Sequence, residues 1–281
     1  MRVGLGSGYV EAVKITDDTS TADRGPAVRR EQLRKRIVAE GFARLDDLAR
    51  SFEVSLMTIH RDVDALQAEG WLVKSRGGAT ANPSALVDGG VRERSFAMRA
   101  EKAAITGLAA SLLHHGQTIF LDDSTTVLGL VPHLSACTPL TLATNFLPVI
   151  SALEDVSGME IHLLGGQYHP RQQACQGRQT VEAIRQLHAD VFFMSTTAIL
   201  NGLCLHRSEA TVLVRQAFME QAARRVLLVD HAKFGRSASH SLCGIEAFDT
   251  VITDAGADPK DVAELRDRCS DVRLAAVGGP A

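Results

Sequence analysis

Hydrophobic positions in the first third of the chain repeat at helical spacing in three consecutive segments. Leu33, Ile37 and Val38 mark the first, and Gly41 follows it as a residue that can end a helix in the left-handed conformation. The second segment has apolar residues at i, i+3, i+4 and i+7, and the third at i, i+4 and i+7. Their residues are Leu45, Leu48, Ala49 and Phe52, then Ile59, Val63 and Leu66. The pattern predicts three short helices around one core.

The residues around the third helix indicate a DNA-binding motif. Ser55 stands at the expected N-cap, and Gly70 can end the helix. Residues 71–73 favour a strand and residues 74–78 a tight, positively charged turn, as in a winged helix-turn-helix whose third helix enters the major groove. The expected DNA contacts are Ser55, Met57, Thr58, His60, Arg61, Lys74 and Arg76. The alternative is a winged helix that binds another protein.

Beyond residue 93, apolar runs of strand length alternate with helical segments. Strands are expected at 118–121, 140–144, 160–164, 191–194, 226–229 and 250–253. Helices are expected at 93–113, 125–134, 147–153, 177–187, 211–223 and 259–268. Such alternation predicts βαβ units and a mostly parallel sheet with helices on both faces.

Two stretches lack these patterns and divide the 281 residues. Residues 1–26 are expected to be a disordered tail, since their second half has few large apolar side chains. Residues 81–92, rich in Asn, Pro, Ser and Gly, are expected to be a linker. The predicted organisation is therefore a small α winged helix-turn-helix domain at 27–80 and a larger α/β domain at 93–281.

Charge and cysteine content change the picture only locally. The formal net charge is −3, but residues 26–82 hold ten Lys and Arg against eight Asp and Glu, whereas residues 83–281 hold seventeen against twenty-one. DNA binding must therefore depend on the local charge of the third helix and the turn. Five cysteines without a CxxC pair, and no signal peptide, favour reduced thiols in the cytoplasm. No apolar run reaches the ~20 residues of a membrane helix, and no spacing suggests a metal site or a nucleotide cofactor.

Polar and small residues follow several of the predicted strands, where ligands bind in open α/β sheets. Four such loops carry hydroxyls, a polar pair, a glycine pair and a cation that suit a phosphorylated ligand. Their residues are Asp122, Ser124, Thr125, Thr126, Thr144, Asn145, Gly165, Gly166 and Lys233. Because adjacent carboxylates would repel a phosphate, at least one of Asp122 and Asp123 is expected to face away.

The most specific stretch of the small domain is Val-Ser-Leu-Met-Thr-Ile-His-Arg-Asp-Val at 54–63, followed by Arg-Gly-Gly-Ala at 76–79. It resembles the DNA-binding domain of the DeoR family of bacterial transcription regulators. The four loops, in their order along residues 93–254, resemble the sensor domain of that family, which is similar in fold to ribose-5-phosphate isomerase and the coenzyme A transferases. The chain departs from the usual family residues at His60, Arg76, Ser124, His169, Thr211 and Arg215.

The resemblance implies a cytoplasmic repressor of a carbohydrate operon, without catalytic residues or a cofactor. It would bind double-stranded operator DNA as a homodimer or homotetramer and respond to a phosphorylated sugar or polyol held by the four loops and Arg171. The residues also allow another function, an isomerase-like enzyme acting on sugar phosphates with a DNA-binding domain attached. Asp122 or Asp123 would then be the base, and Lys233 a cation beside the substrate.

Overall fold

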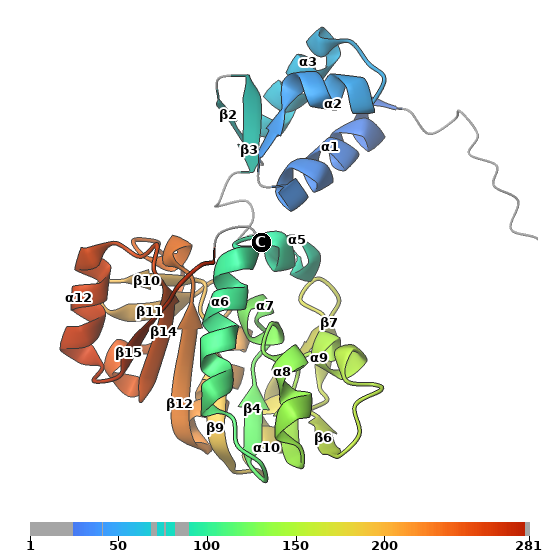
Figure 1. Ribbon diagram of the computed structural model, residues 1–281. Coiled ribbons are helices and arrows are strands. Elements are labelled where there is room, and N and C mark those ends of the chain that lie inside the picture. The colour runs from blue at the N-terminus through green and yellow to red at the C-terminus, as the bar shows by residue number, and fades with distance from the viewer. Residues whose placement is uncertain (1–24, 41, 69–71, 76, 82–89, 279–281) are drawn as a thin grey trace, which may run out of the picture.

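The computed structural model describes residues 25–40, 42–68, 72–75, 77–81 and 90–278 (Figure 1). We call residues 25–81 the winged part and residues 90–278 the sensor part. Most of the expected tail and linker, together with Gly70, Trp71 and Arg76, lies outside the described residues. Pro26, which the sequence places in the tail, begins the first helix.

The winged part contains the three predicted helices and a small sheet. Its elements are α1 (Pro26–Glu40), β1 (Phe42–Arg44), α2 (Leu45–Ser51), α3 (Leu56–Ala68), β2 (Leu72–Ser75) and β3 (Gly78–Ala81). The strands pair antiparallel in the order β1-β3-β2. Leu33, Leu48, Ile59 and Val63 are fully buried in one core, so the apolar spacing identified the correct helix faces. The Ser55 hydroxyl accepts a hydrogen bond from the Thr58 amide at 3.2 Å, which confirms the predicted N-cap.

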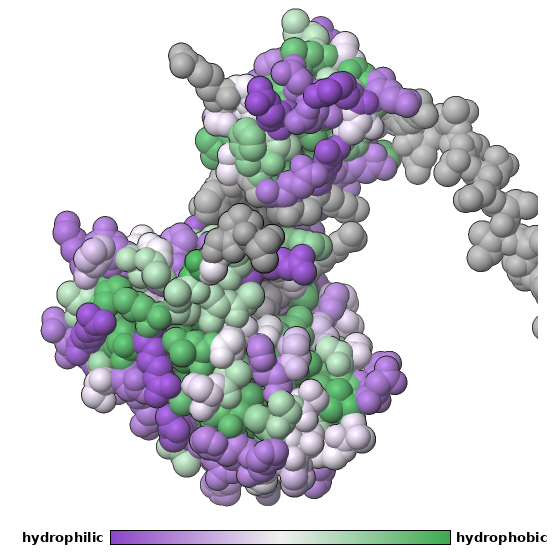
Figure 2. Space-filling view, viewed as in Figure 1, coloured by the Kyte–Doolittle hydropathy of each residue, from purple (hydrophilic) through white to green (hydrophobic). Residues whose placement is uncertain are grey.

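A seven-stranded sheet forms the centre of the sensor part. Its order is β15-β14-β12-β9-β4-β5-β6, and every neighbouring pair is parallel, which confirms the predicted parallel sheet. The strands are β4 (Thr118–Leu121), β5 (Leu140–Thr144), β6 (Met159–Leu163), β9 (Ala189–Met194), β12 (Ala222–Val229), β14 (Thr250–Asp254) and β15 (Val272–Ala275). The edge strand β15, which the sequence did not predict, borders a region near α6 where apolar side chains gather on the surface (Figure 2).

Helices cover both faces of this sheet. One face carries α6 (Arg99–Ala109), α7 (Thr125–Leu128), α8 (Val131–Leu134) and α9 (Leu147–Ala152), and the other carries α10 (Arg178–Ile184), α11 (Glu209–Glu220) and α12 (Pro259–Arg268). Side chains of one strand alternate between the two cores, so Ile119 and Leu121 lie in one and Phe120 in the other. The Phe218 ring of α11 packs on Phe120 and Phe192, with ring centroids 5.0 and 5.1 Å apart.

Smaller antiparallel pairs, absent from the sequence-based prediction, extend the loops at the carboxyl edge. They are β7 (Gln167–His169) with β8 (Ala174–Gln176), and β10 (Ala198–Leu200), β11 (Leu203–His206) and β13 (His240–Gly244) in one sheet. Short 3-10 turns lie at Ala110–Leu112, Ser135–Cys137, His231–Lys233 and Ile245–Ala247. In the described part of the chain, no helix has the length and apolar character needed to cross a bilayer.

The single helix predicted for residues 93–113 is wrong, because the structure breaks it. A short helix α5 (Val91–Phe96) is followed by Met98 in the left-handed region, with φ of 53°, before α6 begins. The break lets the carbonyl of Arg94 accept hydrogen bonds from Lys102 Nζ at 2.6 Å and from Thr125 Oγ1 at 3.2 Å. These buried polar contacts outweigh the helical propensity of the segment.

Candidate functional site

The outer face of α3 presents the residues expected to contact DNA. Met57 is 63% exposed, Ser55 and Arg61 are exposed, and Thr58 and His60 are half-buried. The opposite face of the helix is buried in the core of the winged part. In the described part of the chain, no hydrogen bond or ion pair restrains the Arg61 guanidinium, which leaves it available to a base edge or a phosphate.

Ion pairs orient α3 and engage one expected DNA contact. Arg29 Nε of α1 lies 2.6 Å from Asp62 Oδ2, which is buried, so this pair fixes α3 against α1. Lys74 Nζ pairs with the carboxylate of Asp64. Lys74 would therefore have to break its ion pair with Asp64 in order to bind a DNA phosphate. Arg76, the other expected contact in this turn, lies outside the described residues.

A cavity of 320 Å³ lies at the carboxyl ends of β4, β9 and β12. The loops after these strands contribute residues 124–126, 195–197 and 230–233, and α5 and α6 close one side. Thr80, from β3 of the winged part, also lines it. Of the effector residues expected from the sequence, Ser124, Thr125, Thr126 and Lys233 line this cavity. Its volume is within the range of small-molecule sites.

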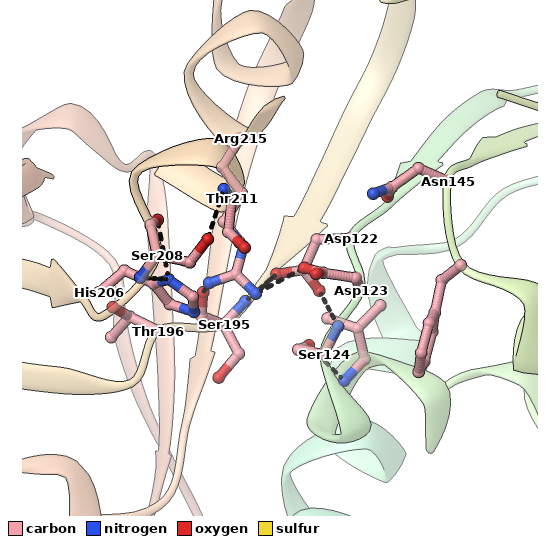
Figure 3. A network of polar contacts seen from close by, with 12 residues as sticks. Asp122, Asp123, Ser124, Asn145, Ser195, Thr196, His206, Ser208, Thr211 and Arg215 are labelled. Atoms are coloured by element: carbon pink, nitrogen blue, oxygen red, sulfur yellow. Dashed lines mark hydrogen bonds and ion pairs between the residues drawn. The ribbon is translucent and has the colours of Figure 1, made fainter. Parts of the chain in front are cut away.

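Arg215 organises the loop after β4 (Figure 3). Its side chain is only 3% exposed, and its Nη2 lies 3.0 Å from Asp122 Oδ2 and 2.9 Å from Asp123 Oδ1, while Nη1 donates to the Ser195 carbonyl at 2.8 Å. Asp122 also accepts from the backbone amides of Ser124 and Ser195, each at 3.0 Å. Asp122 was expected to contact the ligand. Its carboxylate is instead bound by Arg215 and by two backbone amides, and it does not line the cavity.

The same contacts set the charge of the two carboxyl groups. Burial raises the pKa of Asp122. Burial also opposes the charged form of Asp123, but the attraction and hydrogen bond of Arg215, together with other neighbouring groups such as Arg94, lower the pKa of Asp123. Both carboxylates turn to Arg215 (Figure 3). The repulsion between a bound phosphate and this acidic pair is thereby offset by one buried cation.

The polar pair after β5 and the glycines after β6 lie away from the cavity and shape the β7–β8 hairpin. Thr144 and Asn145 are fully buried, and Asn145 Nδ2 donates to the Cys175 carbonyl at 2.7 Å. Gly166 has φ of 151°, and a Cβ there would lie 2.1 Å from Thr180 Oγ1, so only glycine fits. The Gly165 carbonyl accepts from Thr180 Oγ1 at 2.8 Å.

Arg171 lines a second, smaller cavity of 160 Å³ beside the first. Arg94, His206 and Arg215 line both cavities, so the two are neighbours. Burial, together with Arg215, lowers the pKa of His206 to about 3, so its imidazole is neutral at neutral pH.

The main cavity is strongly cationic. Arg94, Lys102, Lys233 and Arg236 line it beside the paired Arg215, and Asp230 is the one carboxylate among the described lining residues. Burial lowers the pKa of Lys102 to about 7 and also lowers the pKa of Lys233. A phosphate ester supplies the negative charge that such a set of cations lacks.

Several lining residues were not predicted as site residues from the sequence. They are Arg94, Lys102, Ser195, Thr196, His206 and Arg215. Asp230 and Arg236 also line the cavity and lie in the predicted loop at 230–236, of which only Lys233 was expected to bind the effector. Ser195 and Thr196 follow strand 191–194, so the strand-end rule that selected the other loops also applies to them. Lys102 shares the buried face of α6 with Ile105 and Ala109. A lysine in the apolar stripe of a helix is unusual, and the sequence alone can identify it as a candidate site residue. Among the described residues, no group of three His, Cys, Asp or Glu side chains is placed to hold a metal ion.

Comparison with known proteins agrees with this arrangement. Residues 29–85 match the DeoR-like helix-turn-helix domain, and residues 97–255 match the DeoR C terminal sensor domain. The chain is 29% identical to the putative aga operon transcriptional repressor of Escherichia coli O157:H7, over 86% of this chain and 91% of that protein. It is 30% identical to the transcriptional repressor AccR of Agrobacterium fabrum (77% and 85% covered) and to the glycerol-3-phosphate regulon repressor of E. coli (77% and 86%).

A solved structure of ribose 5-phosphate isomerase A from Methanocaldococcus jannaschii superposes with a TM-score of 0.36 and 12% identity, over 49% of this chain and 55% of that one. The two family matches together span both parts of the chain, in the order in which the structure places them. The chain belongs to the DeoR family of bacterial transcription regulators.

Proposed function

We propose that the protein is a DNA-binding repressor of a carbohydrate operon whose operator affinity changes when a phosphorylated sugar or polyol binds the cationic cavity. The observation that carries this proposal is the cavity itself, which combines five lysine and arginine side chains with a lining residue from the winged part. Relatives named as repressors of the aga operon and of the glycerol-3-phosphate regulon support the regulatory role.

The position of the cavity suggests how effector binding changes the position of the DNA-reading helix α3. Thr80 of β3 and Phe96 of α5 both line it, and Glu93 Oε1 of α5 lies 3.4 Å from Arg34 Nη2 of α1. A ligand that binds one arrangement of the two parts more tightly shifts the population toward that arrangement. A coupling of about 1–3 kcal/mol changes operator affinity by about 5- to 150-fold.

The geometry favours a regulator over the isomerase-like enzyme. Asp122 and Asp123, the carboxylates considered as a base, are both bound to Arg215. A general base needs a free lone pair within reach of the substrate proton.

We further infer that this cytoplasmic regulator is a homodimer or homotetramer. The reason for the oligomer is that two winged parts must reach half-sites related by a two-fold axis.

Replacing Arg61 with alanine tests the DNA-reading surface. We expect operator binding to weaken by about 1–3 kcal/mol, since an arginine contact to a base edge or phosphate is lost. The measurement is fluorescence anisotropy with a duplex selected by the wild-type protein from a random pool. Arg178→Ala, at an exposed arginine of α10, is the matched control and should bind like wild type. Equal affinity of Arg61→Ala and wild type would refute the placement of the reading helix.

A thermal-shift screen tests the sensor. Each sugar or polyol phosphate is measured beside its unphosphorylated parent, and at ~100 times its Kd a ligand adds about 2.7 kcal/mol to the native state. We expect one phosphate ester to raise the midpoint while its parent does not, and Lys233→Gln to reduce that rise. If no ester in the panel shifts the midpoint, the sugar-phosphate part of the proposal is wrong, whatever the result with DNA.

A further inference from the structure

Two buried polar side chains in the cavity wall make no hydrogen bond within the described chain. Asp230, directly after β12, is 1% exposed, and neither of its carboxylate oxygens has a partner. Ser195, directly after β9, is 3% exposed, and its Oγ also lacks one. Buried polar groups are nearly always hydrogen-bonded, and a buried charge without partners is especially costly. Both residues line the cavity, so a bound molecule can supply the missing partners.

The other buried carboxylates at this edge of the sheet show how unusual Asp230 is. Asp122 and Asp123 are bound by Arg215. Asp254 accepts from the His231 amide at 2.8 Å, from His231 Nδ1 at 2.6 Å and from the Gly256 amide at 3.0 Å. Asp230 alone among these four combines unpaired oxygens with a position in the lining of the main cavity.

The neighbouring Lys102 and Lys233 do not donate hydrogen bonds to the Asp230 carboxylate. The negative charge of Asp230 raises the pKa of both Lys102 and Lys233, against the larger opposing effect of burial. Lys102 Nζ nevertheless directs its hydrogen bonds to the Arg94 carbonyl and to Thr125 Oγ1, at 2.6 and 3.2 Å. Asp230 thus contributes charge to the cavity while its lone pairs stay free.

The chemistry of these two groups restricts the ligand. An ionised carboxylate only accepts hydrogen bonds, and a serine hydroxyl can donate or accept. A phosphate oxygen against Asp230 would place two negative charges together, so the phosphate belongs near the arginines and lysines. We propose that Asp230, assisted by Ser195, binds hydroxyl groups of the sugar or polyol portion of the effector and thereby selects hydroxylated phosphate esters over inorganic phosphate. This inference rests on the proposed function and assigns the two ends of the ligand to different residues.

The test compares wild type with Asp230→Asn, using isothermal titration with inorganic phosphate and with a panel of hexose 6-phosphates, pentose 5-phosphates and glycerol 3-phosphate. In wild type at least one ester should bind more tightly than inorganic phosphate. In Asp230→Asn the affinity for that ester should fall roughly 10- to 100-fold, as expected for a hydrogen bond to a charged group. The affinity for inorganic phosphate should stay equal or rise, because a negative charge has been removed. In Ser195→Ala the affinity for the ester should fall by a smaller factor than in Asp230→Asn.

Controls separate this inference from the proposed function. Asp190→Asn, at an exposed aspartate of β9 that also neutralises one carboxylate, should retain the wild-type preference for the ester. An unchanged preference in both Asp230→Asn and Ser195→Ala would overturn the inference and leave the sugar-phosphate sensor intact. If Asp230→Asn does not fold, Ser195→Ala and Asp230→Glu carry the comparison, and an unchanged preference in both overturns it equally. Failure of every ester to bind wild type would overturn both proposals.

Discussion

Replacing Arg215 with methionine is expected to destabilise the protein by about 3–5 kcal/mol at pH 7, the usual cost of removing one partner from a buried ion pair. The Arg215 guanidinium lies within 3.0 Å of both Asp122 and Asp123, and all three side chains are buried. Methionine fills similar volume but leaves two adjacent carboxyl groups without a cation. The loss of the hydrogen bond to the Ser195 carbonyl adds to this cost. Urea unfolding of the variant and wild type measures the difference.

Two comparisons make this expectation specific. Arg178→Met removes an exposed arginine paired with Glu182, where the side chains are 84% and 55% exposed, and should cost no more than about 1 kcal/mol. Without Arg215, burial raises the pKa of the two carboxyl groups, so the folded variant binds more protons than the unfolded chain. Its deficit should therefore shrink as the pH falls from 7 toward 5. A loss no greater than that of Arg178→Met would show that the buried network does not hold the loop.

The fold of the sheet could be predicted because its strands carry their own signal. Strands 118–121 and 140–144 and helix 259–268 were predicted with the bounds that the structure shows. Each of the two strands is a short apolar run that a parallel sheet buries on both faces. The helix begins at Pro259 behind the N-cap Asp258, whose side chain accepts from the Lys260 amide. Local patterns and tertiary structure agree at these places.

Elements that depend on distant partners could not be predicted. The helix expected at 211–223 ends at Glu220, because Ala222 already pairs with Ala189 of β9. The three small strands β10, β11 and β13 have at most five residues, and β11 is held by β13 from a later part of the chain. Their pairing, and not their composition, decides their conformation.

The candidate site was only partly predictable for the same reason. The strand-end rule identified the loops after β4 and β12, but it could not show which side chains enter the cavity. Asp122 turns away because Arg215, far along the chain on α11, binds it. Lys102 enters the cavity from a helix, and Thr80 from the winged part. Sequence spacing can mark Lys102 as buried within its helix, but it does not show which cavity a side chain from a distant element enters.

Raising the pH from 7 to 9 is expected to stabilise wild type by roughly 2 kcal/mol relative to Lys102→Met, at about 1.4 kcal/mol for each unit of pKa difference. The pKa of Lys102 is lowered from 10.5 to about 7 by burial. Between these values the unfolded chain binds more protons than the folded protein, so the free energy of unfolding rises with pH. Below pH 7 both states are protonated, and the full cost of the buried charge is present. Thermal and urea unfolding at several pH values, without ligand, measure the difference.

The comparison between the two proteins cancels the contribution of the thiols that titrate in this range. Burial raises the pKa of Cys175 and Cys269, which lowers stability as the pH rises, but both thiols are present in wild type and variant and cancel in the difference. A neutral Lys102 amine still donates the hydrogen bond to the Arg94 carbonyl. Losing this bond in Lys102→Met therefore lowers the free energy of unfolding by the same amount at every pH and does not change its slope with pH. Lys260→Met, on the exposed start of α12, should follow wild type at every pH. Parallel curves for wild type and Lys102→Met would mean that Lys102 keeps its proton through this range, and that the cavity already holds a full positive charge there before any anion binds.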